Sequence, residues 1–408
     1  MNTPAENTGN PAAHAPGMPV IAVIGDGQLA RMMQTEAIEL GCSIRVLAGA
    51  PDSSAAQVCA DVLIGDYTDI GDLRRAVDGA DAVTFDHEHV PNEHLDALIA
   101  EGVNVQPQPS ALIFAQDKLV MRKRLGEIGA PVPRFAAIDS VEDAAVFFDE
   151  VDGAVCLKAR RGGYDGNGVW FPDSREGLGT LVEKLLSEGV PLMAEEKLSF
   201  TRELSAMVAR TPSGEVRPWP VVESVQSGGI CVEAIAPAPG MSDEQRERAE
   251  KLSVSVAEAL GVTGVLAVEL FEVDGEIFVN ELAMRPHNTG HWTQEGSVTS
   301  QFEQHLRAVL DFPLGSTETL APVTVMANVL GADKEPEMSV TGRCVEVWRR
   351  FPEAKIHLYG KGYRPGRKLG HVNVVGSDVE QTRKTAAAAA HFLMHGEWDD
   401  NYLNKKEH

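Results

Sequence analysis

The residues most able to do chemistry gather in a glycine-rich loop that begins with cations. Lys158 closes an apolar run, and residues 159–169 follow with four glycines and two arginines. Glycines let backbone N–H groups approach an anion without obstruction from a Cβ, and the neighbouring cations supply charge. The loop matches neither GxxxxGK[ST] nor GxGxxG. It predicts a flap over a polyphosphate, and a solvated glycine-rich turn is the alternative.

Two carboxylates in neighbouring apolar runs form a second candidate site. Glu269 and Glu281 flank Asp274-Gly275, which is a hairpin signal between such runs. A plain two-residue turn would put Glu269 opposite Asn280, whereas a bulge would put it opposite Glu281 on the same face. Magnesium takes hard oxygen ligands and often shares them with phosphates. We expect the bulged register and a shared metal; the alternative is two acids facing solvent.

Two further segments carry clustered cations or imidazoles. Arg285, His287 and His291 follow the second carboxylate, but a proline and a glycine among them disfavour a helix, so a zinc pair is poorly supported. We expect His291 to be a structural histidine. Residues 361–368 hold four cations with two glycines and a proline. This pattern favours a rigid phosphate-binding loop over a plain solvated one.

The turn at residues 25–30 reads Gly-Asp-Gly-Gln-Leu-Ala after an apolar run. Such a strand–turn–helix suits an anion at the helix N-terminus, and a tight turn without a ligand is the alternative. A dinucleotide site would also need an acidic residue at the end of the second strand. None occurs there before Asp52, which disfavours a nicotinamide-dependent dehydrogenase.

The elements that must position these residues change in character along the chain. Alternating strands and helices over residues 19–117 predict a parallel, doubly wound sheet, and residues 134–200 form a small α+β unit. Beyond it we expect strands at 203–210, 219–225 and 230–235, a helix at 243–260 and a hairpin at 264–281. The last part is predicted as short strands at 322–329, 343–349, 355–359 and 371–375, then a helix at 378–395.

Composition excludes several classes of partner. The 408 residues include 60 acidic and 36 basic side chains, a net charge of −24, so neither nucleic acid nor an anionic membrane is an expected partner. No apolar stretch reaches membrane-spanning length. The five cysteines are scattered without CxxC spacing, as in reduced cytoplasmic proteins. Residues 1–17 predict a disordered leader instead of a signal peptide.

Taken together, the motifs resemble those of the ATP-grasp superfamily and, within it, the 5-(carboxyamino)imidazole ribonucleotide synthase family. The most specific segments are residues 162–166, 280–293, 300–308 and 364–371. The resemblance implies a Rossmann-like pre-ATP-grasp domain (18–117), ATP-grasp small and large lobes (118–200 and 201–315) and a β-rich C-terminal domain with a terminal helix (316–408). It further implies ATP-dependent carboxylation of 5-aminoimidazole ribonucleotide by bicarbonate, through carboxyphosphate, in purine biosynthesis.

The same resemblance assigns roles by position and implies a homodimer. Glu269 and Glu281 would bind magnesium, with two ions expected, and Tyr164, Asp165, Arg285 and His287 would act in catalysis. The residues that would bind the ribonucleotide are Gly27, Gln28, Leu29, Glu88, Arg285, His287, Lys361, Arg364 and Arg367. Those that would bind ATP are Lys118, Lys158, Gly163, Tyr164, Asp165, Gly166, Asn167, Gly168, Val169, Glu195, Glu196, Lys197, Leu198, Glu203, Gln226, Asn280 and Glu281.

The chain departs from the family pattern at two positions. Asn167 stands where many members have Arg or Lys, and Gln226 stands where they have His. The first removes a cation from the flap, and the second can hydrogen-bond but cannot carry a proton. Another ATP-grasp carboxylate–amine ligase, a nicotinamide-dependent oxidoreductase and an inactive ribonucleotide-binding regulator are the alternative functions.

Overall fold

A parallel sheet forms the N-terminal part of the molecule, which a computed structural model describes over residues 9–162 and 167–399. Its strands are β1 (Val20–Ile24), β2 (Ser43–Ala48), β3 (Asp61–Ile64) and β4 (Ala82–Phe85), in the order β3-β2-β1-β4. The helices that follow them include α1 (Gln28–Leu40), α2 (Ile70–Val77) and α3 (Asn92–Ala100). The predicted parallel α/β sheet is confirmed. Its strand order reverses between β1 and β4, where ligands bind in such sheets.

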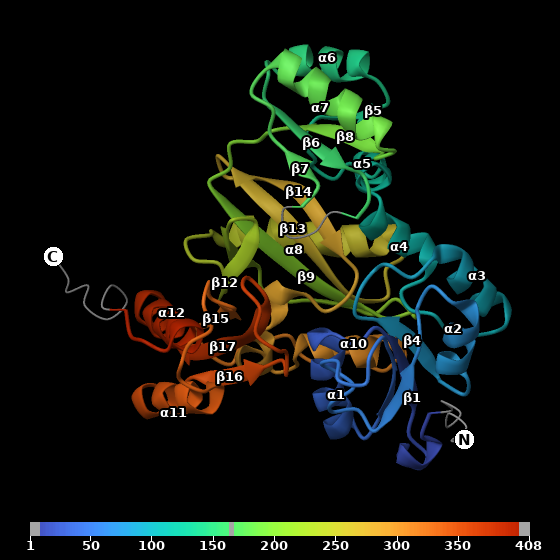
Figure 1. Cartoon of the computed structure of the whole chain (residues 1–408), viewed down its shortest axis with the longest axis vertical. Coiled ribbons are helices and arrows are strands. Elements are labelled where there is room, and N and C mark those ends of the chain that lie inside the picture. The colour runs from blue at the N-terminus through green and yellow to red at the C-terminus, as the bar shows by residue number, and fades with distance from the viewer. Residues whose placement is uncertain (1–8, 163–166, 400–408) are drawn as a thin grey trace.

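A small antiparallel sheet lies at the opposite end of the molecule (Figure 1). Its order is β5-β8-β6-β7, with α6 (Val141–Glu150) and α7 (Arg175–Ser187) packed against it. The four strands are β5 (Phe135–Ile138), β6 (Val155–Ala159), β7 (Val169–Trp170) and β8 (Leu192–Glu196). The predicted glycine loop connects β6 to β7. Residues 109–127 lead into this unit as α4 (Pro109–Gln116) and α5 (Lys118–Glu127).

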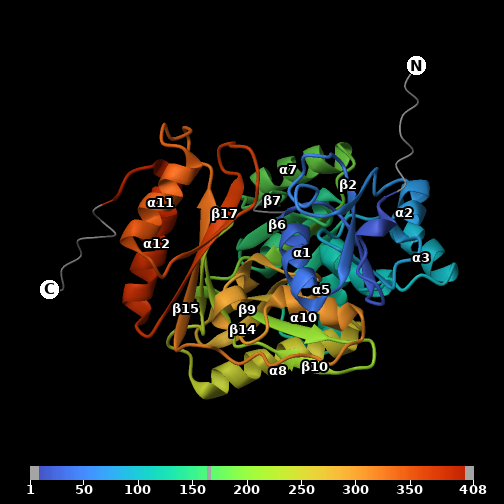
Figure 2. The ribbon, with the colours of Figure 1, turned by 90° about the horizontal axis from the view of Figure 1, so that it is seen from below.

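One large antiparallel sheet joins the centre of the molecule to its C-terminal part. Its order is β14-β13-β9-β11-β12-β15-β17-β16, and β10 pairs with β9. The strands are β9 (Arg202–Arg210), β10 (Val216–Pro218), β11 (Val222–Ser227), β12 (Ile230–Ala236), β13 (Gly264–Val273), β14 (Glu276–Ala283), β15 (Val323–Leu330), β16 (Lys355–Leu358) and β17 (Lys368–Gly376). The helices are α8 (Asp243–Leu260), α9 (Thr293–Gly296), α10 (Gln301–Val309), α11 (Val340–Arg350) and α12 (Val379–His395). Figure 2 shows α11 and α12 together beside β15 and β17.

A buried histidine on α10 joins the N-terminal sheet to the large one. The Nδ1 atom of His305 accepts the Val265 N–H at 3.0 Å, so Nε2 carries the proton and faces Thr84 Oγ1 at 2.7 Å. Burial lowers the pKa of His305 to about 3, which keeps the ring neutral. Thr84 is the penultimate residue of β4, and Val265 lies on β13. His305 therefore fixes these two strands relative to each other.

Two expectations from the sequence are wrong. Residues 343–349 form part of the helix α11, whose buried residues Arg343, Cys344 and Val347 recur at helical spacing and whose N-cap, Ser339, accepts the Gly342 N–H. β-branched and aromatic residues suggested a strand, but packing against the sheet decides the outcome.

The predicted disordered leader does not extend over residues 9–17. A short 3-10 helix (Pro11–Ala13) lies there, and Asp61 accepts the Asn10 N–H at 2.6 Å and faces His14 Nε2 at 2.6 Å. Composition could not reveal this docking, because it depends on a buried carboxylate far along the chain. Residues 1–8 lie outside the described part of the chain. All five cysteines are free. In the described ranges, no helix is both long and apolar enough to cross a membrane.

Candidate active site

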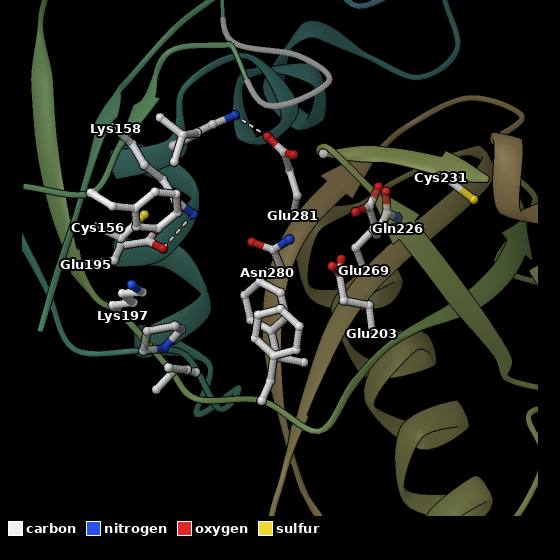
Figure 3. Close-up of a pocket in the computed structure, with 18 of the residues that line it drawn as sticks. Cys156, Lys158, Glu195, Lys197, Glu203, Gln226, Cys231, Glu269, Asn280 and Glu281 are labelled. Atoms are coloured by element: carbon white, nitrogen blue, oxygen red, sulfur yellow. Dashed lines mark hydrogen bonds and ion pairs between the residues drawn. The ribbon is translucent and has the colours of Figure 1, made fainter. Parts of the chain in front are cut away.

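The β13–β14 hairpin brings two acidic side chains together on one face. Glu269 pairs with Glu281, whereas Leu270 pairs with Val279, so Asn280 is an extra residue in β14. The turn residues Asp274 and Gly275 have φ angles of 51° and 84°, as a tight hairpin turn requires. The predicted bulged register is therefore confirmed. Figure 3 shows Glu269, Asn280 and Glu281 around the same cavity.

Both carboxylates have a cationic or imidazole partner. Glu281 forms a close ion pair with Lys118, and Glu269 Oε1 lies 3.1 Å from His287 Nε2. Burial alone would raise the pKa of Glu269, but its contact with His287 and the nearby Arg285 hold it below the usual range. The two carboxyl groups and the Asn280 amide form a set of hard oxygen donors.

This donor set fits magnesium. Within the described ranges, no group of three or more His, Cys, Asp or Glu side chains could hold a metal ion as an all-protein cage. Magnesium commonly takes one or two carboxylates and completes its octahedron with substrate phosphates and water. Glu269 and Glu281 both line the cavity described next, so a phosphate bound there would lie beside them.

A cavity of about 360 Å³ lies between the small sheet and the central strands. It is lined by these residues predicted to bind ATP or metal: Lys118, Lys158, Val169, Glu195, Glu196, Lys197, Leu198, Glu203, Gln226, Glu269, Asn280 and Glu281. Asn167 is exposed and Gly168 is half-buried, and neither is part of this lining. Gly163, Tyr164, Asp165 and Gly166 lie outside the described residues.

Aromatic side chains form one wall of this cavity, which the sequence reasoning missed. Phe200 and Phe271 stack with their centroids 4.5 Å apart, and the Lys197 ammonium lies 5.1 Å from the Phe171 ring centroid. Phe271 is two residues from Glu269 on β13, so strand periodicity places both on one face and could have identified it. Flat aromatic surfaces of this kind suit a stacked base.

A buried ion network holds Lys158 at the cavity. The Glu195 carboxylate accepts hydrogen bonds from Lys158 Nζ and Arg122 Nε, each at 2.7 Å, and Figure 3 shows the former. Burial would raise the pKa of Glu195, but Arg122 and Lys158 lower it to about 2. The neighbouring Glu196 pairs instead with Arg134 at 2.9 Å. The Glu195 side chain therefore positions a cation, a role that the sequence did not suggest.

Two other predicted nucleotide residues are held differently. Glu203 is half-buried near Glu269, and burial together with that neighbouring charge raises the pKa of Glu203 to about 7. Gln226 donates from Nε2 to Ser224 Oγ at 2.8 Å. It therefore acts as a neutral, fixed amide in the wall of the cavity.

A second and a third cavity adjoin the first. The third, of about 680 Å³, is lined by all nine residues predicted to bind the ribonucleotide, and also by Asp86, His87, His89 and Lys368. The second, of about 660 Å³, shares Lys118, Glu269 and Glu281 with the first and shares Glu88 and Arg285 with the third. His287 lines all three cavities. The two acids and His287 thus stand where the cavities meet.

The chain itself supplies the anion at the predicted anion-binding turn. The Gly27 N–H donates to Asp86 Oδ2 at 2.5 Å. A Cβ at Gly25, whose φ is 118°, would overlap the Asp86 carboxylate. Burial raises the pKa of Asp86 to about 6. The Gln28 side chain, also in this turn, contacts Lys361 and lines the third cavity.

Strong contacts bring the ends of β4 and β14 together. Glu88 accepts the Met284 N–H at 3.2 Å and Arg285 Nε at 2.9 Å. Burial would lower the pKa of Arg285, but Glu88 raises it, so the guanidinium stays charged.

His291 is buried and forms a hydrogen bond with Gln301 through Nδ1 at 2.9 Å, and burial lowers its pKa well below the usual value. It is a neutral core histidine, as predicted.

Comparisons with known proteins agree with this architecture. Three family models match successive parts of the chain: a ribonucleotide synthetase preATP-grasp domain at residues 18–116, an ATP-grasp domain at 123–302 and a phosphoribosylaminoimidazole carboxylase C-terminal domain at 324–385. The N5-carboxyaminoimidazole ribonucleotide synthase of Corynebacterium ammoniagenes is 65% identical, over 97% of each chain.

Solved structures are similar over almost the whole chain. An ADP complex of N5-carboxyaminoimidazole ribonucleotide synthetase is 31% identical, with a TM-score of 0.84 over 93% of this chain and 98% of that one. The Aspergillus clavatus synthase in complex with ADP and 5-aminoimidazole ribonucleotide is 30% identical, with a TM-score of 0.83 over 92% and 99%. The chain therefore belongs to the N5-carboxyaminoimidazole ribonucleotide synthase family of ATP-grasp ligases.

Proposed function

We propose that this protein uses ATP to join bicarbonate to the amine of 5-aminoimidazole ribonucleotide, giving the N5-carboxyamino product of purine biosynthesis. The observation that carries the proposal is the meeting of three cavities at His287, beside the Glu269 and Glu281 side chains. A nucleotide in the first cavity and a ribonucleotide in the third would have their reacting ends at this junction. Family membership supports the same reaction.

ATP would occupy the first cavity. Its base would lie between the aromatic wall and the segment 195–198, and Glu203 would accept hydrogen bonds from the ribose. Lys118 and Lys158 would bind the phosphates from opposite sides. Magnesium, as two ions held by Glu269 and Glu281 with Asn280 beside them, would neutralise charge on those phosphates.

The first chemical step transfers the γ-phosphoryl group to bicarbonate, releasing ADP and forming carboxyphosphate. Both reactants are anionic, so the barrier that the protein can lower is charge repulsion and misalignment. Arg285, held by Glu88, and His287, held by Glu269, would orient bicarbonate at the junction. The amine of the ribonucleotide then attacks the carbon, and phosphate leaves.

The ribonucleotide would occupy the third cavity. Lys361, Arg364 and Arg367 line that cavity and suit its phosphate, and Gln28 and Glu88 line it as well. The roles of Tyr164 and Asp165 rest on the family resemblance alone. We propose that Asp165 positions the amine or accepts its proton.

Product analysis tests the reaction directly. The protein is incubated with MgATP, labelled bicarbonate and 5-aminoimidazole ribonucleotide, and both ADP and trapped labelled product are measured. We expect one ADP for each labelled product, and no ADP without the ribonucleotide. Labelled product without ATP consumption, or ADP release that ignores bicarbonate, would contradict the proposal. Glu281→Gln should abolish ADP release, because it removes a charge from the metal donor set.

We propose further that the enzyme is a cytoplasmic homodimer. Five free thiols suit a reducing compartment. α11 exposes Val340, Val345 and Trp348, with Trp348 48% exposed, which offers apolar surface to a second copy. Light scattering should give twice the chain mass of 43.9 kDa. A monomer at micromolar concentration would argue against it.

A further inference from the structure

One buried carboxylate outside the predicted site residues gathers an unusual number of donors. Asp117, only 2% exposed, is the N-cap of α5 and accepts the Leu119 and Val120 N–H groups at 3.1 and 3.2 Å. It also accepts Arg160 Nη2 at 3.0 Å and Arg161 Nε at 3.1 Å. A helix cap needs only the two backbone contacts. The two arginine contacts therefore call for another explanation.

Those contacts join two segments that both present cations to the site. The residue after Asp117 is Lys118, which begins α5, forms the ion pair with Glu281 and lines the first two cavities. Arg160 and Arg161 follow β6, which carries Lys158, and Arg161 lines the second cavity. The Lys118 N–H also donates to the Arg160 carbonyl at 2.9 Å. The two segments are thus bonded through both a side chain and the backbone.

Asp117 is charged in this position. Burial would raise the pKa of Asp117, but hydrogen bonds from Arg160, Val120 and Arg161 hold it below its usual range. Hydrogen bonds to an ionised acceptor are shorter and stronger than neutral ones, and they fix the orientation of a guanidinium. Without this anion, Arg160 and Arg161 would repel Lys118 and each other.

We propose that Asp117 is a positioning residue, which sets Lys118, Arg160 and Arg161 in place around the phosphate end of the nucleotide cavity. It touches no substrate itself and acts through these three cations. The inference rests on the proposed function, because it assumes that ATP phosphates bind beside Lys118. It adds a residue to which no role in binding or catalysis had been assigned.

The test compares Asp117→Asn with a matched cap variant, Asp69→Asn. Asparagine caps helices as well as aspartate does, so both variants keep their backbone contacts. Asp69 caps α2 by accepting the Gly71 and Asp72 N–H groups, the same two positions, and among the described residues no arginine forms an ion pair with its side chain. In Asp117→Asn, an NH2 group takes the place of the carboxylate oxygen that accepts from Arg160 and Arg161, so a donor then faces two donors.

We expect Asp117→Asn to raise KM for ATP at least about tenfold and to lower kcat, as loss of charged hydrogen bonds and displaced cations would. Asp69→Asn should change neither. A purely structural role would instead lower the melting temperature and leave both kinetic constants unchanged in the folded fraction. That result would overturn the proposal.

A double-mutant cycle with Arg161→Gln gives a second readout that does not depend on the buried variant alone. The Arg161 side chain is 56% exposed, so its replacement should fold normally. If Asp117 acts through Arg161, the two changes together should raise KM for ATP by less than the product of their single effects. Multiplicative effects, or an Arg161→Gln variant with unchanged KM, would overturn it. If wild-type protein released no ADP, the proposed function would fail instead.

Discussion

Replacing Glu195 by glutamine tests whether the buried ion network holds the nucleotide cavity together. The change leaves Arg122, which is fully buried, and Lys158, whose side chain is 10% exposed, around a neutral amide. The fall in the pKa of Glu195 from 4.5 to about 2 corresponds to about 3 kcal/mol, at about 1.4 kcal/mol for each tenfold change in proton affinity. Removing one partner of a buried pair typically costs about 3–5 kcal/mol. We therefore expect the free energy of unfolding to fall by about 3 kcal/mol.

The adjacent residue provides the control. Glu196 also pairs with an arginine, but the Arg134 side chain is 57% exposed, and an exposed pair contributes about 0–1 kcal/mol. Urea unfolding of wild type, Glu195→Gln and Glu196→Gln at pH 7 should therefore separate the two variants clearly. Since Lys158 loses its anchor, Glu195→Gln should also raise KM for ATP, and Glu196→Gln should change it much less.

The pH dependence gives the refuting result. A carboxyl whose pKa is lowered on folding stabilises the protein above its unfolded value of about 4.5, and that stabilisation disappears as the pH falls towards 2. The difference between wild type and Glu195→Gln should thus be constant from pH 7 to about 5 and shrink below that range. A loss of less than about 1 kcal/mol at pH 7, or a difference that grows on acidification, would refute the reasoning.

Two further predictions concern Lys361 and Gly25. Burial and the nearby Arg367 lower the pKa of Lys361 to about 8. The KM for the ribonucleotide should therefore rise as the pH increases through 8, and Lys361→Met should remove that dependence. A wild-type KM that does not change with pH would contradict this. Gly25→Ala should destabilise the protein by several kcal/mol in calorimetry, because the new Cβ would overlap the Asp86 carboxylate and the backbone is left-handed there. Gly126 lies within α5 and has open space around it, so Gly126→Ala should leave the stability unchanged or increase it. Equal losses of stability in Gly25→Ala and Gly126→Ala would contradict the explanation.

The sequence predicted best where chemistry restricted the geometry. Shared metal binding required Glu269 and Glu281 on one face, and this requirement selected the bulged register. Residues 343–349 had no such requirement, and intrinsic strand preference alone gave the wrong element.

Side-chain contacts between distant parts of the chain could not be predicted from the sequence. The turn at residues 25–30 resembles a phosphate site in the sequence because Asp86, the partner of the Gly27 N–H, lies 59 residues later, just after a strand that becomes its neighbour only in the folded sheet. Likewise, the family resemblance places Glu195 at the nucleotide, and nothing in the local pattern indicates that Arg122 reaches its carboxylate. Side-chain partners of this kind follow from topology, which a linear pattern does not contain.

The extra residue in β14 has a consequence for how densely the hairpin can present oxygen atoms. In a regular strand, adjacent side chains point to opposite sides, so only every second residue can reach a given ligand. Asn280 and Glu281 are adjacent and yet both line the same cavity. Deleting Asn280 would restore ordinary alternation and keep the two acids opposite each other, but the hairpin would then offer two donors where it now offers three.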